Sequence, residues 1–145
     1  MSLSPKYDED FCGWVSNTAV LLKAGKYEEV EMDKVIEEIE ALGRSERNQL
    51  ESRLEQLLFH LLKWQFQPDF RSRSWSASID EQRIKIKRVL QQNPGLTSEL
   101  LLFIEDAYKG SFLLIKKETP IDLAILPKEC PYTWEQIIND DFYPE

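Results

Sequence analysis

The sequence is poor in the residues from which catalytic and metal sites are built. Its 145 residues include one histidine, His60, and two cysteines, Cys12 and Cys130, which lie far apart. Zinc motifs, di-iron sites with paired Glu-x-x-His motifs and Cys-x-x-Cys redox sites all need more of these residues. A glycine-rich phosphate loop and a nucleophile elbow are missing as well. The sequence therefore indicates no catalytic, metal-binding or cofactor-binding residue, and only a site made of carboxylates and arginines stays open.

Long apolar runs and a secretory leader are also missing. The longest apolar stretches, at 57–59 and 61–62, are far shorter than the roughly 20 residues that span a membrane. No basic stretch followed by an apolar core opens the chain, and isolated cysteines are typical of reduced thiols in the cytosol. We therefore predict a cytoplasmic protein that does not associate with membranes.

Glycine is scarce, whereas residues that favour helices are abundant. The chain has five glycines and many Leu, Ile, Glu, Gln and Lys residues, and runs that alternate between apolar and polar residues are absent. We predict a single all-α domain over residues 1–145, a bundle of about four main helices with a long central helix and a short C-terminal helix. The main helices are expected near 8–24, 33–66, 76–92 and 97–117.

Local signals mark the ends of these helices. Asp8 is expected to cap the first helix and Gly25 to end it. The long helix continues through Gly43 and ends before Pro68. Thr133 and Gln136, three residues apart, have the spacing of a capping box for the last helix.

Charge is distributed unevenly along the chain. Residues 1–43 carry four Lys and ten Asp or Glu, residues 44–88 carry ten Lys or Arg and six Asp or Glu, and residues 89–145 carry four Lys and ten Asp or Glu. A basic middle therefore separates two acidic ends. It either packs against its acidic flanks or forms a binding surface, and the sequence leaves both interpretations open.

A row of polar residues runs along the long predicted helix beside its apolar face. Glu46, Arg53 and His60 follow one another at intervals of seven residues, which keeps them on one side of a helix. They either pair with other helices, for example with Gln82 or Arg83, or form a small pocket in which Arg53 and His60 bind an anion or a partner.

The segment 71–88 mixes cations with an aromatic residue. Arg71, Arg73, Arg83 and their neighbours surround Trp75, a composition that suits phosphate contacts and base stacking. A solvated helix face explains it equally well. The four tryptophans, including Trp64, are expected to anchor contacts between helices, and an exposed pair would instead mark a partner surface.

Several short motifs occur together in one order: Gly43-Arg44-Ser45-Glu46, His60-Leu61-Leu62-Lys63-Trp64, Glu81-Gln82-Arg83 and Cys130-Pro131-Tyr132-Thr133. This combination resembles the bacterial, largely cyanobacterial family called domain of unknown function 29, over nearly the whole chain. Pro94-Gly95-Leu96 departs from the Pro-Ser-Leu more often found there, which concerns only a turn. The resemblance implies a compact helical domain and no established activity.

We therefore predict a non-catalytic interaction or regulatory module that acts through protein contacts. One form of this hypothesis is a homodimer along the long helix. The alternative is a nucleic-acid-associated accessory factor of the toxin–antitoxin type, which would use segment 71–88. An enzyme is the third hypothesis. The candidate ligand or partner surface consists of Glu46, Arg53, His60, Trp64, Arg71, Arg73, Trp75 and Arg83.

Overall fold

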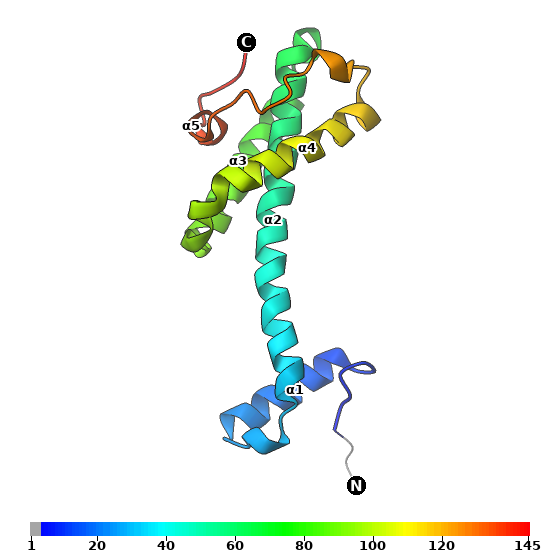
Figure 1. The fold of residues 1–145 in the computed structure, drawn as a ribbon, viewed down its shortest axis with the longest axis vertical. Coiled ribbons are helices and arrows are strands. Elements are labelled where there is room, and N and C mark those ends of the chain that lie inside the picture. The colour runs from blue at the N-terminus through cyan, green and yellow to red at the C-terminus, as the bar shows by residue number, and fades with distance from the viewer. Residues whose placement is uncertain (1–3) are drawn as a thin grey trace. The chain divides into compact units, whose positions relative to one another are not determined.

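The protein is all-α, as the composition predicts. A computed structural model describes residues 4–145, and the described residues form helices and turns without a strand. The five α-helices are α1 (Phe11–Lys23), α2 (Met32–Phe66), α3 (Arg73–Gln92), α4 (Leu100–Glu118) and α5 (Trp134–Ile138) (Figure 1). The long helix and the short C-terminal helix are both confirmed.

Three helices begin elsewhere than predicted, and local capping explains the differences. α1 begins at Phe11 because the carboxylate of Asp10, and not that of Asp8, accepts the backbone N–H of Gly13 at 3.0 Å. α3 begins at Arg73 because the Ser72 hydroxyl accepts the N–H of Trp75. α4 begins late because residues Pro94–Glu99 form a tighter 3₁₀ turn before it.

Other signals act as the sequence predicts. α2 is one continuous helix through Gly43 and ends at Phe66, just before Gln67 and Pro68. Gly25 adopts the left-handed conformation, with φ of 74°. Thr133 and Gln136 form both hydrogen bonds of the capping box at α5. No helix among residues 4–145 is long and apolar enough to cross a membrane.

The chain divides at Arg44 into two compact units, which we call the N-terminal unit (described from residue 4) and the C-terminal unit (Ser45–Glu145). The C-terminal unit contains a continuous core of 19 buried apolar residues, contributed by α2, α3, the 3₁₀ turn Pro94–Glu99, α4, α5 and the segment before α5. Leu54, Leu58 and Leu61 of α2 are fully buried at its centre. This unit holds every candidate residue that the sequence identifies.

The N-terminal unit consists of α1, a 3₁₀ turn at Tyr27–Glu29 and the first part of α2. Its buried side chains are those of Trp14 and Thr18. The ring of Tyr7 packs edge-on against those of Phe11 and Trp14, and its hydroxyl donates to Glu38. A small aromatic cluster thus joins the start of the chain to α2 within this unit.

Candidate functional site

The polar row of α2 does not converge on one point. A helix rises about 1.5 Å per residue, so intervals of seven residues separate neighbouring members of the row by roughly 10 Å. Each member has its own surroundings. Glu46 accepts a hydrogen bond from the Asn93 side chain at 3.0 Å, whereas the Nδ1 atom of His60 lies 2.9 Å from the Gln56 carbonyl. Glu46, Arg53 and His60 therefore cannot act together on a single small ligand.

His60 is a half-buried side chain on the edge of the core. Its ring meets that of Phe59 edge-on, with centroids 5.2 Å apart. Burial lowers the pKa of His60, and the nearby Lys63 ammonium lowers it further, while the hydrogen bond to Gln56 opposes the shift. The imidazole is consequently neutral at pH 7, which removes it as a cationic donor for an anion.

Arg53, the third member, is half-buried without a hydrogen bond or ion pair among residues 4–145. Its charge acts on Glu81 of α3, whose pKa is lowered first by the hydrogen bond from Lys85 and to a smaller degree by Arg53. Gln82, which the sequence offers as a partner for the row, is buried, and its carbonyl oxygen Oε1 accepts no hydrogen bond. The row therefore has contacts at its two ends and a weakly held cation in the middle.

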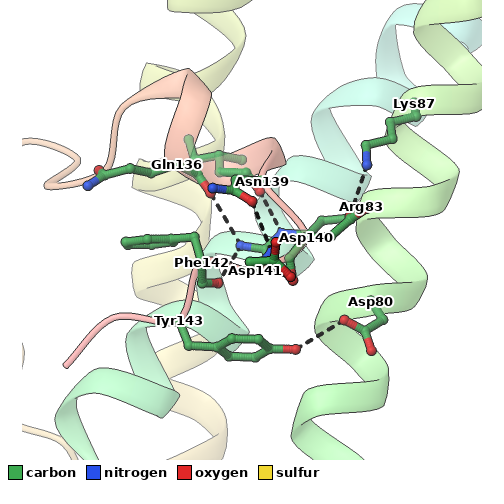
Figure 2. A network of polar contacts seen from close by, with 10 residues as sticks. Asp80, Arg83, Lys87, Gln136, Asn139, Asp140, Asp141, Phe142 and Tyr143 are labelled. Carbon is green, nitrogen blue, oxygen red and sulfur yellow. Dashed lines mark hydrogen bonds and ion pairs between the residues drawn. The ribbon is translucent and has the colours of Figure 1, made fainter.

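Arg83 is the most fully enclosed charged side chain of the described residues, with no exposed surface. Its guanidinium donates to the backbone carbonyls of Ile137 and Phe142 at 2.8 Å each, and more weakly to those of Gln136 and Asp140 (Figure 2). Burial lowers the pKa of Arg83. Because four carbonyls surround it, this side chain holds the C-terminal segment against α3 and is not available to a ligand.

Other contacts support the same attachment of the C-terminal segment. The Tyr143 hydroxyl donates to Asp80 at 3.0 Å, and Lys87 pairs with Asp140 at 2.9 Å (Figure 2). Arg71 donates to the carbonyls of Trp64 and Pro144, and its guanidinium lies 5.2 Å from the centre of the Trp64 ring. Trp64 and Arg71, two residues of the predicted partner surface, thus help to hold the C-terminal end of the chain.

Most cations of segment 71–88 have partners inside the protein. Lys85 pairs with Glu81 at 2.6 Å, and the half-buried ring of Trp75 lies under the Lys63 ammonium at 4.5 Å. Arg73 and Arg88 are exposed, and within residues 4–145 neither has a hydrogen bond or ion pair. Four of the six cations of segment 71–88 are therefore bound by the protein's own groups, and Arg73 and Arg88 are the cations of this segment that remain for an external anion.

A hollow of the C-terminal unit lies between α4 and the chain from Lys128 to the start of α5. It encloses about 750 Å³ and is lined by Tyr108, Cys130, Tyr132 and Trp134 together with charged residues at its rim. The hydroxyls of Tyr108 and Tyr132 donate at 2.6 Å to the Pro127 carbonyl and to Gln65. Burial also raises the pKa of the Cys130 thiol, which disfavours the thiolate, and the two tyrosine hydroxyls of this wall are already engaged.

A different surface stands out in the N-terminal unit. Among residues 4–145, eight of the fourteen large apolar side chains that are exposed belong to it. On α2 they are Met32, Ile36, Ile39 and Leu42, and on α1 and the turn they are Phe11, Val15, Val20 and Tyr27. We call Phe11, Val15, Met32, Ile36 and Ile39 the apolar rows. The helical spacing of these residues is visible in the sequence, but spacing does not reveal whether another part of the chain covers them.

Comparison with known proteins identifies one family. The family model described as Domain of unknown function DUF29 matches residues 6–143. No curated protein and no solved structure matches the chain. The match covers both units, so the apolar rows and the Arg83 network lie within the region that defines the family.

Proposed function

Because the chain belongs to the Domain of unknown function DUF29 family, whose description assigns no activity, we propose a function from its surface: a non-catalytic, cytoplasmic interaction or regulatory module that contacts another protein chain through the apolar rows. The apolar rows, exposed at helical spacing on α1 and on α2, carry this proposal. Soluble domains seldom leave an extended apolar patch in water unless a partner covers it. The exposed thiol of Cys12 supports the cytoplasmic location, since such thiols persist where the surroundings are reducing.

The sparse core of the N-terminal unit supports the same function. Trp14 and Thr18 are its buried side chains, whereas a unit of about forty residues ordinarily needs a disulfide, a metal or a partner to be stable. Covering the apolar rows would add buried apolar surface at about 25 cal/mol per Å². A partner chain would therefore stabilise this unit as well as bind it.

Site-specific crosslinking tests this function. A photoreactive phenylalanine derivative in place of Ile39, which is 62% exposed, is compared with the same derivative in place of Leu113, which is 66% exposed on α4. We expect a discrete crosslinked protein adduct, or a covalent dimer, from position 39 and not from position 113. Sedimentation velocity of the full chain shows whether the partner is a second copy. A strict monomer that crosslinks equally from both positions contradicts the proposal.

A second function rests on Arg73 and Arg88, the exposed cations of segment 71–88 without internal partners among the described residues. They could contact phosphates of a nucleic acid, as a toxin–antitoxin-type accessory factor would require. This function predicts nucleic-acid binding that weakens steeply with salt. In an Arg73→Ala, Arg88→Ala variant, the slope of log K against log salt concentration should fall by the contribution of about two phosphate contacts. Arg83→Ala is unsuitable for this test because Arg83 is buried. No binding at low salt excludes the function.

A further inference from the structure

We infer that the partner of the apolar rows presents a cationic amphipathic helix. The inference rests on the proposed function and names the chemistry of the partner that the same surface accepts. Helices are the natural occupants of exposed helical rows, because side chains spaced three and four residues apart on one helix fit between those of another. The charge of the partner follows from the groups beside the rows.

Carboxylates line one edge of the row on α2. Successive residues of a helix turn by about 100°, which places Asp33, Glu37 and Glu40 together beside Met32, Ile36 and Ile39. All three carboxylates are exposed, and within residues 4–145 none of them forms an ion pair. The only cation on this edge is Arg44, so the edge attracts positive charge.

A hollow of about 230 Å³ adjoins the same edge. Its lining includes Glu37, Glu38, Glu40 and Arg44. Glu38 already accepts the Tyr7 hydroxyl and thereby raises the pKa of Tyr7 to about 12. Glu37 and Glu40 remain open to a Lys or Arg side chain that reaches in from a docked helix.

A second copy of the chain is a poor occupant for electrostatic reasons. Residues 1–43 carry four lysines against ten acidic residues, so pairing two N-terminal units brings like charges together. The basic segment of another copy offers limited compensation, because Arg73 and Arg88 are its exposed cations without an ion pair among the described residues. Its Arg83 is buried, while Arg47, Lys85 and Lys87 are paired with carboxylates. An anionic membrane surface is disfavoured by the same carboxylates.

A peptide titration with the full-length chain tests this inference. The probe is a labelled amphipathic helical peptide of about eighteen residues, long enough to form several turns, with Leu on one face and Lys on the other. Two comparators carry Glu in place of Lys, or the Leu and Lys residues in scrambled order. Fluorescence anisotropy is expected to show binding of the Lys peptide at least about tenfold tighter than that of either comparator, which corresponds to about 1.4 kcal/mol.

Matched variants locate the binding. Ile36→Asp with Ile39→Asp should weaken the Lys peptide by at least about tenfold, since anchor residues dominate interface energies. Leu102→Asp with Leu113→Asp places the same charges on exposed positions of α4, and should leave affinity unchanged. Glu37→Gln with Glu40→Gln should weaken binding about threefold to tenfold and reduce its dependence on salt. Glu129→Gln with Glu145→Gln is the control, because it changes the net charge by the same amount.

The possible outcomes separate the partner chemistry from the proposed function. Equal binding of the Lys and Glu peptides, or full binding by the Ile36→Asp, Ile39→Asp variant, overturns the cationic helix. A dimer that this variant dissociates, without peptide binding, also overturns it but leaves the interaction function in place. Binding to vesicles of anionic lipid in preference to the peptide overturns it in favour of a membrane. Helical circular dichroism of each variant confirms that it is folded.

Discussion

The two units of the chain bury apolar side chains to very different degrees. The C-terminal unit encloses a core cluster of 19 buried apolar residues, whereas Trp14 is the one buried apolar side chain of the N-terminal unit, among the described residues. α2 contributes to both units with a helical apolar pattern on either side of the polar stretch 43–49. Similar periodicity therefore produces a core where other helices cover the pattern, and an exposed surface where they do not.

The contrast extends to polar groups. In the C-terminal unit, several cations have partners within the chain: backbone carbonyls bind Arg83, and carboxylates pair with Lys85 and Lys87. In the N-terminal unit, Asp33, Glu37 and Glu40 remain exposed beside apolar residues. The C-terminal unit thus binds several of its cations within the chain, and the N-terminal unit leaves both apolar and charged groups for an external contact. Four predictions examine this difference.

The largest effect is expected from truncating a core residue. Leu58→Ala removes atoms from a fully buried site and should lower the free energy of unfolding by about 3 kcal/mol. Ile39→Ala, the matched change on the exposed row of α2, should alter it by less than about 0.5 kcal/mol. Urea denaturation followed by circular dichroism measures both. Equal losses would show that Ile39 is covered, and the comparison between the units would fail.

Arg83→Met should have the next largest effect. Methionine retains much of the apolar length but removes every donor, so the carbonyls of Ile137, Phe142 and Gln136 lose their partner. Leaving buried acceptors unpaired should cost about 2 kcal/mol in total, and limited proteolysis should then cleave the C-terminal segment faster. Lys85→Met, which breaks a partly exposed ion pair, should cost less than about 0.5 kcal/mol. An Arg83→Met protein as stable as the Lys85→Met protein would mean that the network does not hold the segment.

Much of the fold could be predicted from the sequence because its signals are local. The leucines from Leu50 to Leu61 follow helical spacing, form the apolar face of α2 and are buried. Gly25, Pro68 and the Thr133–Gln136 pair end or begin helices through interactions within a few residues. Capping was misplaced at α1 because Asp8 and Asp10 are chemically equivalent, and only the geometry of the turn selects Asp10.

The surface could not be predicted in the same way because it depends on distant parts of the chain. Ile36 and Ile39 have the same spacing as the buried leucines, and nothing local shows that no helix of their unit covers them. The burial of Arg83 depends on carbonyls more than fifty residues away, which composition and charge counts do not reveal. The predicted polar row does lie along one helix, but the rise of the helix over seven residues keeps its members apart.

Gly43→Ala should stabilise the chain modestly and show whether the two units unfold together. A Cβ atom at this helical position meets no other group within 4 Å, so alanine should add about 0.5–1 kcal/mol through its lower unfolded-state entropy. Gly25→Ala is the control, because its site is equally open but has φ of 74°, and it should destabilise by about 1 kcal/mol.

Amide hydrogen exchange reports where these effects occur. Because the N-terminal unit has few buried side chains, we expect both glycine substitutions to change protection in α1 and the first part of α2 while the C-terminal unit is unaffected. A uniform change along the chain would instead support the single cooperative domain over residues 1–145 that the sequence predicts.

The smallest effect is expected from the titration of His60. Burial lowers the pKa of this imidazole in the folded protein below its ordinary value of 6.5, so the unfolded chain takes up the proton more readily. The contribution of His60 to stability is therefore fully present above pH 6.5 and declines as the pH falls through that value. The chain has a single histidine, so one imidazole resonance in proton NMR gives the folded pKa directly. His60→Gln should reduce the slope of stability against pH between pH 7.5 and 5.5 relative to the parent protein. Because both proteins have the same carboxylates, the comparison cancels the contribution of these groups to the slope. A folded pKa at or above 6.5 would place the ring in water, and the edge of the C-terminal core would then be as open as the apolar rows.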